Sequence, residues 1–218
     1  MKHLIGIVIL FFSTITVQFG QYTSPKDSDP QALALLQKAG ENFSSKNTQV
    51  TFSLKLSYPG QEGEPAVGTL YQSGTSYRLD LDQYSIISDG KTRWVYLKTQ
   101  NEINIYNETQ AQDWLSPSDF LQLHKAQDLV FVLAGTKTDG SSIIEAKPLK
   151  GRFQDYAKFT IVVKNGSLTS IKAISKDGTR QEMFIGTVIH PATFDSAKLF
   201  TFNKSLYPGV HIEDLRID

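Results

Sequence analysis

The sequence of 218 residues contains no cysteine. Disulfides, thiolate metal sites, iron–sulfur clusters and cysteine nucleophiles are therefore excluded, and so is a lipid anchor attached to a cysteine. An excess of one charge is also lacking, because 22 Lys and Arg residues balance 22 Asp and Glu residues. A neutral chain without blocks of like charge has no electrostatic footprint for nucleic acid, so nucleic acid is not an expected partner.

Motifs for cofactor binding and catalysis are also missing. No two glycines are two residues apart, which excludes a dinucleotide fingerprint, and there is neither a Walker phosphate loop nor a nucleophile elbow. Beyond the first twenty residues three histidines remain, and none is within helical or strand reach of another: His124, His190 and His211. We therefore expect no metal site, no cofactor and no enzyme activity.

Two weaker patterns have a structural explanation. Ser88 and Lys91 match the loose serine-x-x-lysine pattern of penicillin-recognising enzymes, but Asp89-Gly90 between them favours a hairpin turn where those enzymes begin a helix. Asp80 and Asp82 share one face of a predicted strand, and such a face is more often solvated than a pair of catalytic carboxylates.

Residues 1–20 have the composition of a secretory signal peptide, with a short basic start and then an apolar run. Polar side chains dilute this run from Ser13 onwards, whereas a transmembrane anchor needs roughly 18–20 strongly apolar residues. We expect cleavage after Gly20, a polar tether at residues 21–29, and a periplasmic location for the remaining chain.

Two amphipathic helices are predicted. Asp29-Pro30 can begin the first, because Asp caps a helix and Pro suits its first position. Apolar residues follow at helical spacing, namely Leu33, Leu36, Ala39 and Phe43. Ser116-Pro117-Ser118-Asp119 predicts the start of a second helix, whose apolar residues are Phe120, Leu121 and Leu123.

Alternating apolar and polar residues predict a large antiparallel sheet. The clearest alternation is at residues 50–58, and turn signals such as Asp89-Gly90 recur at intervals of roughly 8–12 residues. Further strands are expected at residues 77–82, 94–96, 129–133, 159–163, 168–174, 179–188, 199–202 and 210–215.

The apolar face of this sheet must be covered by closure, by a second sheet or by helices. We expect one strongly curved sheet, a barrel or half-barrel, with the two helices on its concave side. The residues expected to face that side are Val50, Phe52, Leu54, Leu56, Tyr77, Leu79, Leu81, Trp94 and Tyr96, with Arg78 and Arg93 on the other side. The interior is either a filled core or a partly hollow hydrophobic ligand site.

Several segments together resemble a known family. They are Gly68-Thr69-Leu70-Tyr71, Tyr77-Arg78-Leu79, the most specific run at residues 86–96, Ser116-Pro117-Ser118, Phe200-Thr201-Phe202, Pro208-Gly209-Val210 and Asp214-Leu215-Arg216. These segments are similar to the LolA family of periplasmic lipoprotein carriers, in particular to its Bacteroidetes-like members, over most of residues 30–216. Better-known proteobacterial members have an Arg-Pro pair whose arginine ties a lid shut, and this sequence has Ser73-Gly74 there.

The resemblance implies an open, incomplete antiparallel barrel at residues 30–218, helices that form a lid, a hydrophobic cavity and no enzymatic activity. The partners that it implies are acylated lipoproteins, an inner-membrane lipoprotein-releasing ABC transporter and an outer-membrane acceptor, with the carrier acting as a monomer. The cavity residues that we expect are Leu36, Phe43, Phe52, Leu54, Leu56, Tyr77, Leu79, Leu81, Trp94, Tyr96, Phe120, Leu121 and Leu123.

Two alternatives remain open. The same half-barrel suits a periplasmic lipid-binding or envelope-stress-sensing module as well as a lipoprotein carrier. The helix that begins at Ser116-Pro117 is expected to be a movable lid, because its apolar content is modest, but a rigid cap over a filled core is the alternative.

Overall fold

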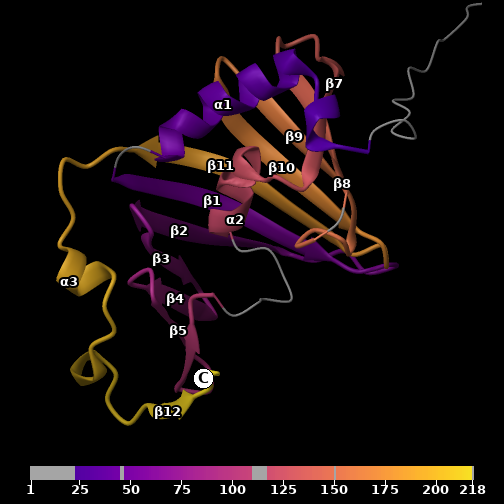
Figure 1. Ribbon diagram of the computed structural model, residues 1–218. Helices are drawn as coiled ribbons and strands as arrows, with labels where there is room; N and C mark the ends of the chain where they lie inside the picture. Colours follow the sequence, from indigo (N-terminus) through magenta and orange to yellow (C-terminus); the bar gives the residue numbers. More distant parts are fainter. Residues whose placement is uncertain (1–22, 45–46, 110–116, 150, 218) are drawn as a thin grey trace, which may run out of the picture.

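The structure is a computed structural model that describes residues 23–44, 47–109, 117–149 and 151–217. The predicted signal peptide and cleavage site, the first two residues of the tether, and Ser116 lie outside the described residues. Within the described ranges, twelve strands form one sheet in the order β12-β6-β5-β4-β3-β2-β1-β11-β10-β9-β8-β7. The sheet is strongly curved and does not close (Figure 1). The predicted open half-barrel is therefore confirmed.

The strands follow the expected meander closely. Their bounds are β1 Thr48–Ser57, β2 Pro65–Ser73, β3 Ser76–Leu81, β4 Tyr84–Ser88, β5 Thr92–Leu97, β6 Glu102–Asn107, β7 Leu129–Thr136, β8 Ser142–Pro148, β9 Tyr156–Lys164, β10 Ser167–Ser175, β11 Arg180–Ile189 and β12 His211–Asp214. Neighbouring strands pair antiparallel except at one edge, where β12 pairs parallel with β6.

Local turn chemistry connects these strands. Between β4 and β5, the Asp89 carboxylate accepts hydrogen bonds from the backbone N–H groups of Lys91 and Thr92, both at 2.8 Å. Gly90 has φ 88°, a left-handed conformation that glycine adopts without steric cost. The serine-x-x-lysine pattern is thus part of a hairpin turn, as the sequence predicts.

Four helical segments lie on the concave side of the sheet. They are η2 Pro25–Asp27, α1 Pro30–Ser44, α2 Pro117–Leu121 and η3 Leu123–Lys125. Asp29 caps α1, since its carboxylate accepts from the backbone N–H groups of Gln31 at 2.7 Å and Ala32 at 3.4 Å. Figure 1 shows α1 along strands β7 to β11, with α2 on the same concave side.

The main core fills the space between α1, α2–η3 and the sheet. Its largest fully buried side chains include Phe120 from α2, Phe131 from β7 and Phe159 from β9. These three come from segments far apart in the sequence, so the core depends on long-range packing of the helices on the sheet rather than on one local motif.

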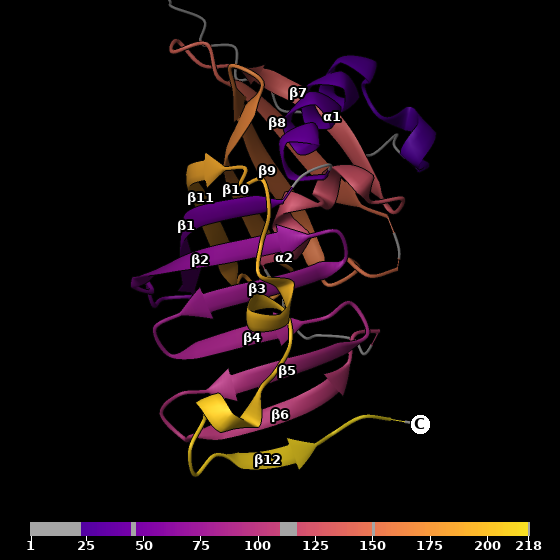
Figure 2. The same ribbon diagram turned by 90° about the vertical axis from the view of Figure 1, so that its left-hand side faces the viewer.

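The chain after β11 crosses the opposite, outer face of the sheet (Figure 2). It contains α3 Ser196–Leu199 and η4 Lys204–Leu206 before it ends in β12. The strand expected at residues 199–202 is wrong, because this segment is a helix end and a bend that pack their aromatic rings on the sheet. Phe202 lies 6.3 Å from the Trp94 ring, and Tyr207 lies 4.8 Å from the Tyr96 ring, centroid to centroid.

Candidate ligand-binding cavity

A cavity of about 700 Å³ opens on the concave side of the sheet. It spans β1, β4, β5 and β6 on one side and the ends of β9, β10 and β11 on the other. Its lining residues are Leu54, Leu56, Tyr58, Tyr84, Ile86, Arg93, Val95, Leu97, Tyr106, Tyr156, Ser175, Asp177, Thr179 and Gln181. The volume is in the range of roughly 300–1,000 Å³ that is typical of small-molecule sites.

Aliphatic side chains form the floor of this cavity. Leu54 and Leu56 alternate along β1, and Val95 and Leu97 alternate along β5, because every second residue of a strand faces the same side. Leu56 keeps 38% of its surface exposed although it faces inward. An aliphatic surface that the fold leaves uncovered within a concavity is suited to an apolar ligand.

Tyrosines and a few polar groups form the rest of the wall. The Tyr156 hydroxyl donates to Gln181 Oε1 at 3.3 Å, and burial raises the pKa of Tyr84 to about 12. Asp177 accepts from the Thr179 backbone N–H at 2.9 Å and from its hydroxyl at 3.0 Å. Asp177 is therefore used by its own turn, and nothing in this set resembles a nucleophile with an adjacent base.

A buried polar cluster lies toward the Arg93 end of the cavity. The Tyr77 hydroxyl donates to Glu108 Oε1 at 3.2 Å, and the Ser88 hydroxyl donates to Glu108 Oε2 at 2.7 Å. Burial, followed by the Glu108 charge, raises the pKa of Tyr77, so its phenol remains a proton donor at neutral pH. Arg93 lies on the same face, with its guanidinium carbon 5.2 Å from the centre of the Tyr106 ring.

The predicted cavity residues fall into three places. Two of them, Leu54 and Leu56, line the 700 Å³ cavity. Five surround a remnant space of about 10 Å³ between α1, α2–η3 and the sheet, and these are Leu36, Phe43, Phe120, Leu121 and Leu123. Phe52, Tyr77, Leu79 and Leu81 belong to the same buried cluster. A space of 10 Å³ holds at most about one water molecule, so these nine side chains form a packed core in this structure.

Trp94 and Tyr96 require a correction. Arg93, Val95 and Leu97 line the cavity, so the alternation of β5 directs Trp94 and Tyr96 to the outer face. There they contact the aromatic rings of the segment after β11. The charge of Arg93 suggested the opposite orientation, but its guanidinium is buried on the concave side.

Sequence reasoning missed most of the cavity wall, in particular Tyr84, Ile86, Arg93, Val95, Leu97, Tyr106, Tyr156 and Gln181. A usable signal exists for β5. Residues 94–97 are all apolar or aromatic, so both faces of this strand must be covered, and the arginine alone could not decide which face is inside.

The segment α2–η3 packs closely against α1. A Cβ atom at Gly40 would lie 2.5 Å from the Cε1 and Nε2 atoms of His124, so the missing side chain makes room for the imidazole ring. Burial lowers the pKa of His124. An ion pair between Asp119 and Arg152 also attaches α2 to the loop before β9. Apolar packing and the Asp119–Arg152 ion pair therefore hold the segment against α1 and the sheet.

The chain matches no protein-family model and no curated protein. Among solved structures it is similar to a DUF1329 family protein from Desulfovibrio piger, with a TM-score of 0.50, 14% identity, and coverage of 83% of this chain and 100% of that chain. It is also similar to a LolA superfamily protein from Nitrosomonas europaea, with a TM-score of 0.44, 14% identity, and coverage of 78% and 97%. At this identity the DUF1329 likeness supports the fold alone.

Two features are absent from the described residues. None of their helices combines the length and the apolar character needed to cross a membrane. The same residues include no grouping of three or more histidines and carboxylates that could hold a metal ion.

Proposed function

We propose that this protein is a non-enzymatic carrier that holds the acyl chains of lipids or lipoproteins in its concave cavity. The observation that supports the proposal is the 700 Å³ cavity, which has an aliphatic floor. Among the described residues that line it, no arrangement of side chains suggests a reaction.

The free energy gained when an acyl chain is removed from water is large. Each methylene group removed from water contributes about 0.8 kcal/mol, so a chain of sixteen carbons contributes roughly 12 kcal/mol. An acyl chain therefore crosses an aqueous compartment only when it is covered. Release then requires a second state of the protein with lower affinity, because a ligand is moved between states only by its difference in affinity.

The specific form of this proposal is transport of acylated lipoproteins across a periplasm. Its partners would be an inner-membrane lipoprotein-releasing ABC transporter and an outer-membrane acceptor. The alternative is a periplasmic lipid-binding or envelope-stress-sensing module that uses the same cavity. Native mass spectrometry of the protein purified from its own host distinguishes them. Acylated protein as cargo supports the carrier of lipoproteins, and free lipid supports the alternative.

A matched pair of variants tests the cavity itself. Leu56 faces the cavity from β1, whereas Val67 of the adjacent strand β2 pairs with Ser53 and lies on the outer face with 68% exposure. Leu56→Glu places a carboxylate against an acyl chain, and desolvation of that charge costs several kcal/mol. We expect Leu56→Glu to lower the affinity for a fluorescent fatty acid at least about 100-fold. Val67→Glu adds the same charge and should leave the affinity unchanged.

Thermal unfolding shows whether both variants fold, since neither residue belongs to the packed core. Equal affinities of Leu56→Glu and Val67→Glu, with both proteins folded, would show that acyl chains do not enter this cavity.

A further inference from the structure

Two buried polar atoms in the described residues have no hydrogen-bond partner: Arg93 Nη1 and Asn104 Oδ1. Both belong to the concave face. Arg93 pairs with Tyr106 across β5 and β6, and Val95, which faces the cavity, pairs with Asn104. Arg93 and Asn104 are therefore diagonal neighbours on one face, with their Cα atoms about 7–8 Å apart. Unpartnered buried polar atoms are rare in folded proteins, so two side by side call for an explanation.

The guanidinium of Arg93 is almost completely buried, with 3% of the residue exposed. No ion pair among the described residues includes it. Its guanidinium carbon lies 5.2 Å from the centre of the Tyr106 ring, and its charge also acts on the Tyr77 hydroxyl. A buried arginine is normally paired with an anion, because removal of a charge from water is expensive unless that charge is compensated.

Nearby Glu108 does not fill this role. Both of its carboxylate oxygens already accept hydrogen bonds from neutral hydroxyls, those of Tyr77 and Ser88. These bonds direct the carboxylate toward β3 and β4. The side of Arg93 that adjoins the cavity is left without an anionic partner in the described structure.

We infer that Arg93 and Asn104 form a head-group site at one end of the cavity for a lipid with an anionic oxygen, a carboxylate or a phosphate. This inference rests on the proposed function and names its ligand class. Arg93 would donate to the anionic oxygens, for which a guanidinium is well suited. The unpartnered Asn104 Oδ1 is an acceptor, so it would accept from a hydroxyl group of the head group rather than bind the anionic oxygens. The acyl chain then follows Val95 and Leu97 along β5 toward the Leu54 and Leu56 end.

The length of the floor agrees with this direction. Leu97 lies four positions after Arg93 on β5, and at about 3.3 Å per residue the apolar path beyond the guanidinium is roughly 13 Å long. One charged end and one aliphatic path match a lipid with one head and at least one tail.

The test uses the full exported chain and three ligands that carry the same sixteen-carbon tail. Palmitate carries a carboxylate, palmitoyl lysophosphatidate carries a phosphate, and methyl palmitate is neutral. Affinities are measured by isothermal titration at pH 8, where both anions are ionised. We expect at least one anionic lipid to bind about 10- to 100-fold more tightly than methyl palmitate, the size of effect typical of a charged hydrogen bond. Whichever anion binds more tightly identifies the head group.

Arg93→Met should reduce the preference, which is the affinity for the anionic lipid divided by that for methyl palmitate, to about one. The affinity for methyl palmitate itself should stay the same. Arg93→Lys, which keeps the charge, should retain part of the preference. Arg78→Met is the control, because Arg78 lies on the outer face of β3 and pairs with Asp80 there at 2.8 Å. A structural role for Arg93 would instead lower the unfolding temperature of ligand-free Arg93→Met without a change in preference.

The outcomes separate this inference from the proposed function. If all three ligands bind the parent protein with equal affinity, the head-group site is wrong and the carrier remains supported. If none of them binds, the proposed function itself is wrong. The comparison of ligands on the parent protein needs no variant, so it stands even if Arg93→Met fails to fold.

Discussion

Replacement of Phe120 by alanine can show whether α2–η3 is a movable lid or part of a rigid core. Phe120 is 1% exposed and adjoins a remnant space of only about 10 Å³, so its ring is fully packed. Phe131 in β7 is 2% exposed within the same cluster, which makes it a matched control in the sheet. Loss of a buried phenylalanine ring from a rigid core costs about 3–5 kcal/mol.

The free energy that docks α2–η3 is expected to be smaller than this. Burial of Phe120, Leu121 and Leu123 contributes roughly 5–9 kcal/mol at about 1.5–3 kcal/mol for each side chain. Ordering of the nine residues from Pro117 to Lys125 opposes it with about 9 kcal/mol, at about 1 kcal/mol per residue. The two contributions nearly cancel, so the segment can undock while the sheet stays folded.

A lid that undocks cannot cost the whole protein more than its own docking free energy. We therefore expect Phe120→Ala to lower the free energy of unfolding by less than about 2 kcal/mol, whereas Phe131→Ala loses the full 3–5 kcal/mol. Urea unfolding followed by circular dichroism measures both losses. Hydrogen exchange should show fast exchange at residues 117–125 in Phe120→Ala. Equal losses in the two variants, with this segment still protected, would refute the lid and favour a rigid cap.

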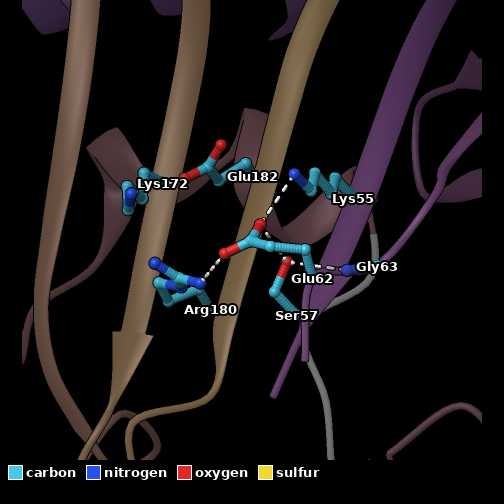
Figure 3. Close-up of polar contacts among 7 residues, drawn as sticks. All are labelled: Lys55, Ser57, Glu62, Gly63, Lys172, Arg180 and Glu182. Carbon is cyan, nitrogen blue, oxygen red and sulfur yellow. Dashed lines mark hydrogen bonds and ion pairs between the residues drawn. The ribbon is translucent and has the colours of Figure 1, made fainter. Parts of the chain in front are cut away.

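Two further predictions concern pH. Because burial lowers the pKa of His124, folding favours its neutral form, so stability should fall as the pH drops below 6.5; this slope should disappear in His124→Gln, and an unchanged slope would mean that another group causes it. On the outer face, a hydrogen bond from Lys55, supported by the charge of Arg180, lowers the pKa of Glu62 to about 2 (Figure 3). The stabilisation of the folded state by ionised Glu62 is complete above pH 4.5 and is lost as the pH falls toward 2. Acid unfolding of Glu62→Gln should lack this loss of stability, and an unfolding curve identical to that of the parent would contradict the prediction.

The sequence predicts the sheet well where one face is dry and the other is wet. In β3, Tyr77, Leu79 and Leu81 alternate with polar residues, and all three are buried as expected. Such a pattern leaves one register in which the apolar set is covered. The same logic correctly identifies Leu54 and Leu56 as part of an exposed apolar concavity.

The pattern fails where distant segments cover both faces. Trp94 and Tyr96 are partly covered on the outer side by aromatic residues more than one hundred positions later, Phe202 and Tyr207. No local periodicity shows this contact. The buried position of Arg93 is equally hidden, because a charged residue in an alternating strand is normally on the wet face. Local alternation gives the strands, and long-range packing decides which residues of β5 line the cavity.

The lid and the cavity share a wall, which connects their two predictions. Ile86 belongs to the packed cluster beneath the helices and also lines the cavity, and Leu54 packs against that cluster from the cavity side. If α2–η3 undocks, the side chains around Phe120 lose their cover and extend the apolar surface that begins at Leu54. The docked state has the cavity of about 700 Å³, while an open state would add the face now filled by the core. A cargo with several acyl chains would therefore favour the open state, because it covers surface that a single chain cannot reach.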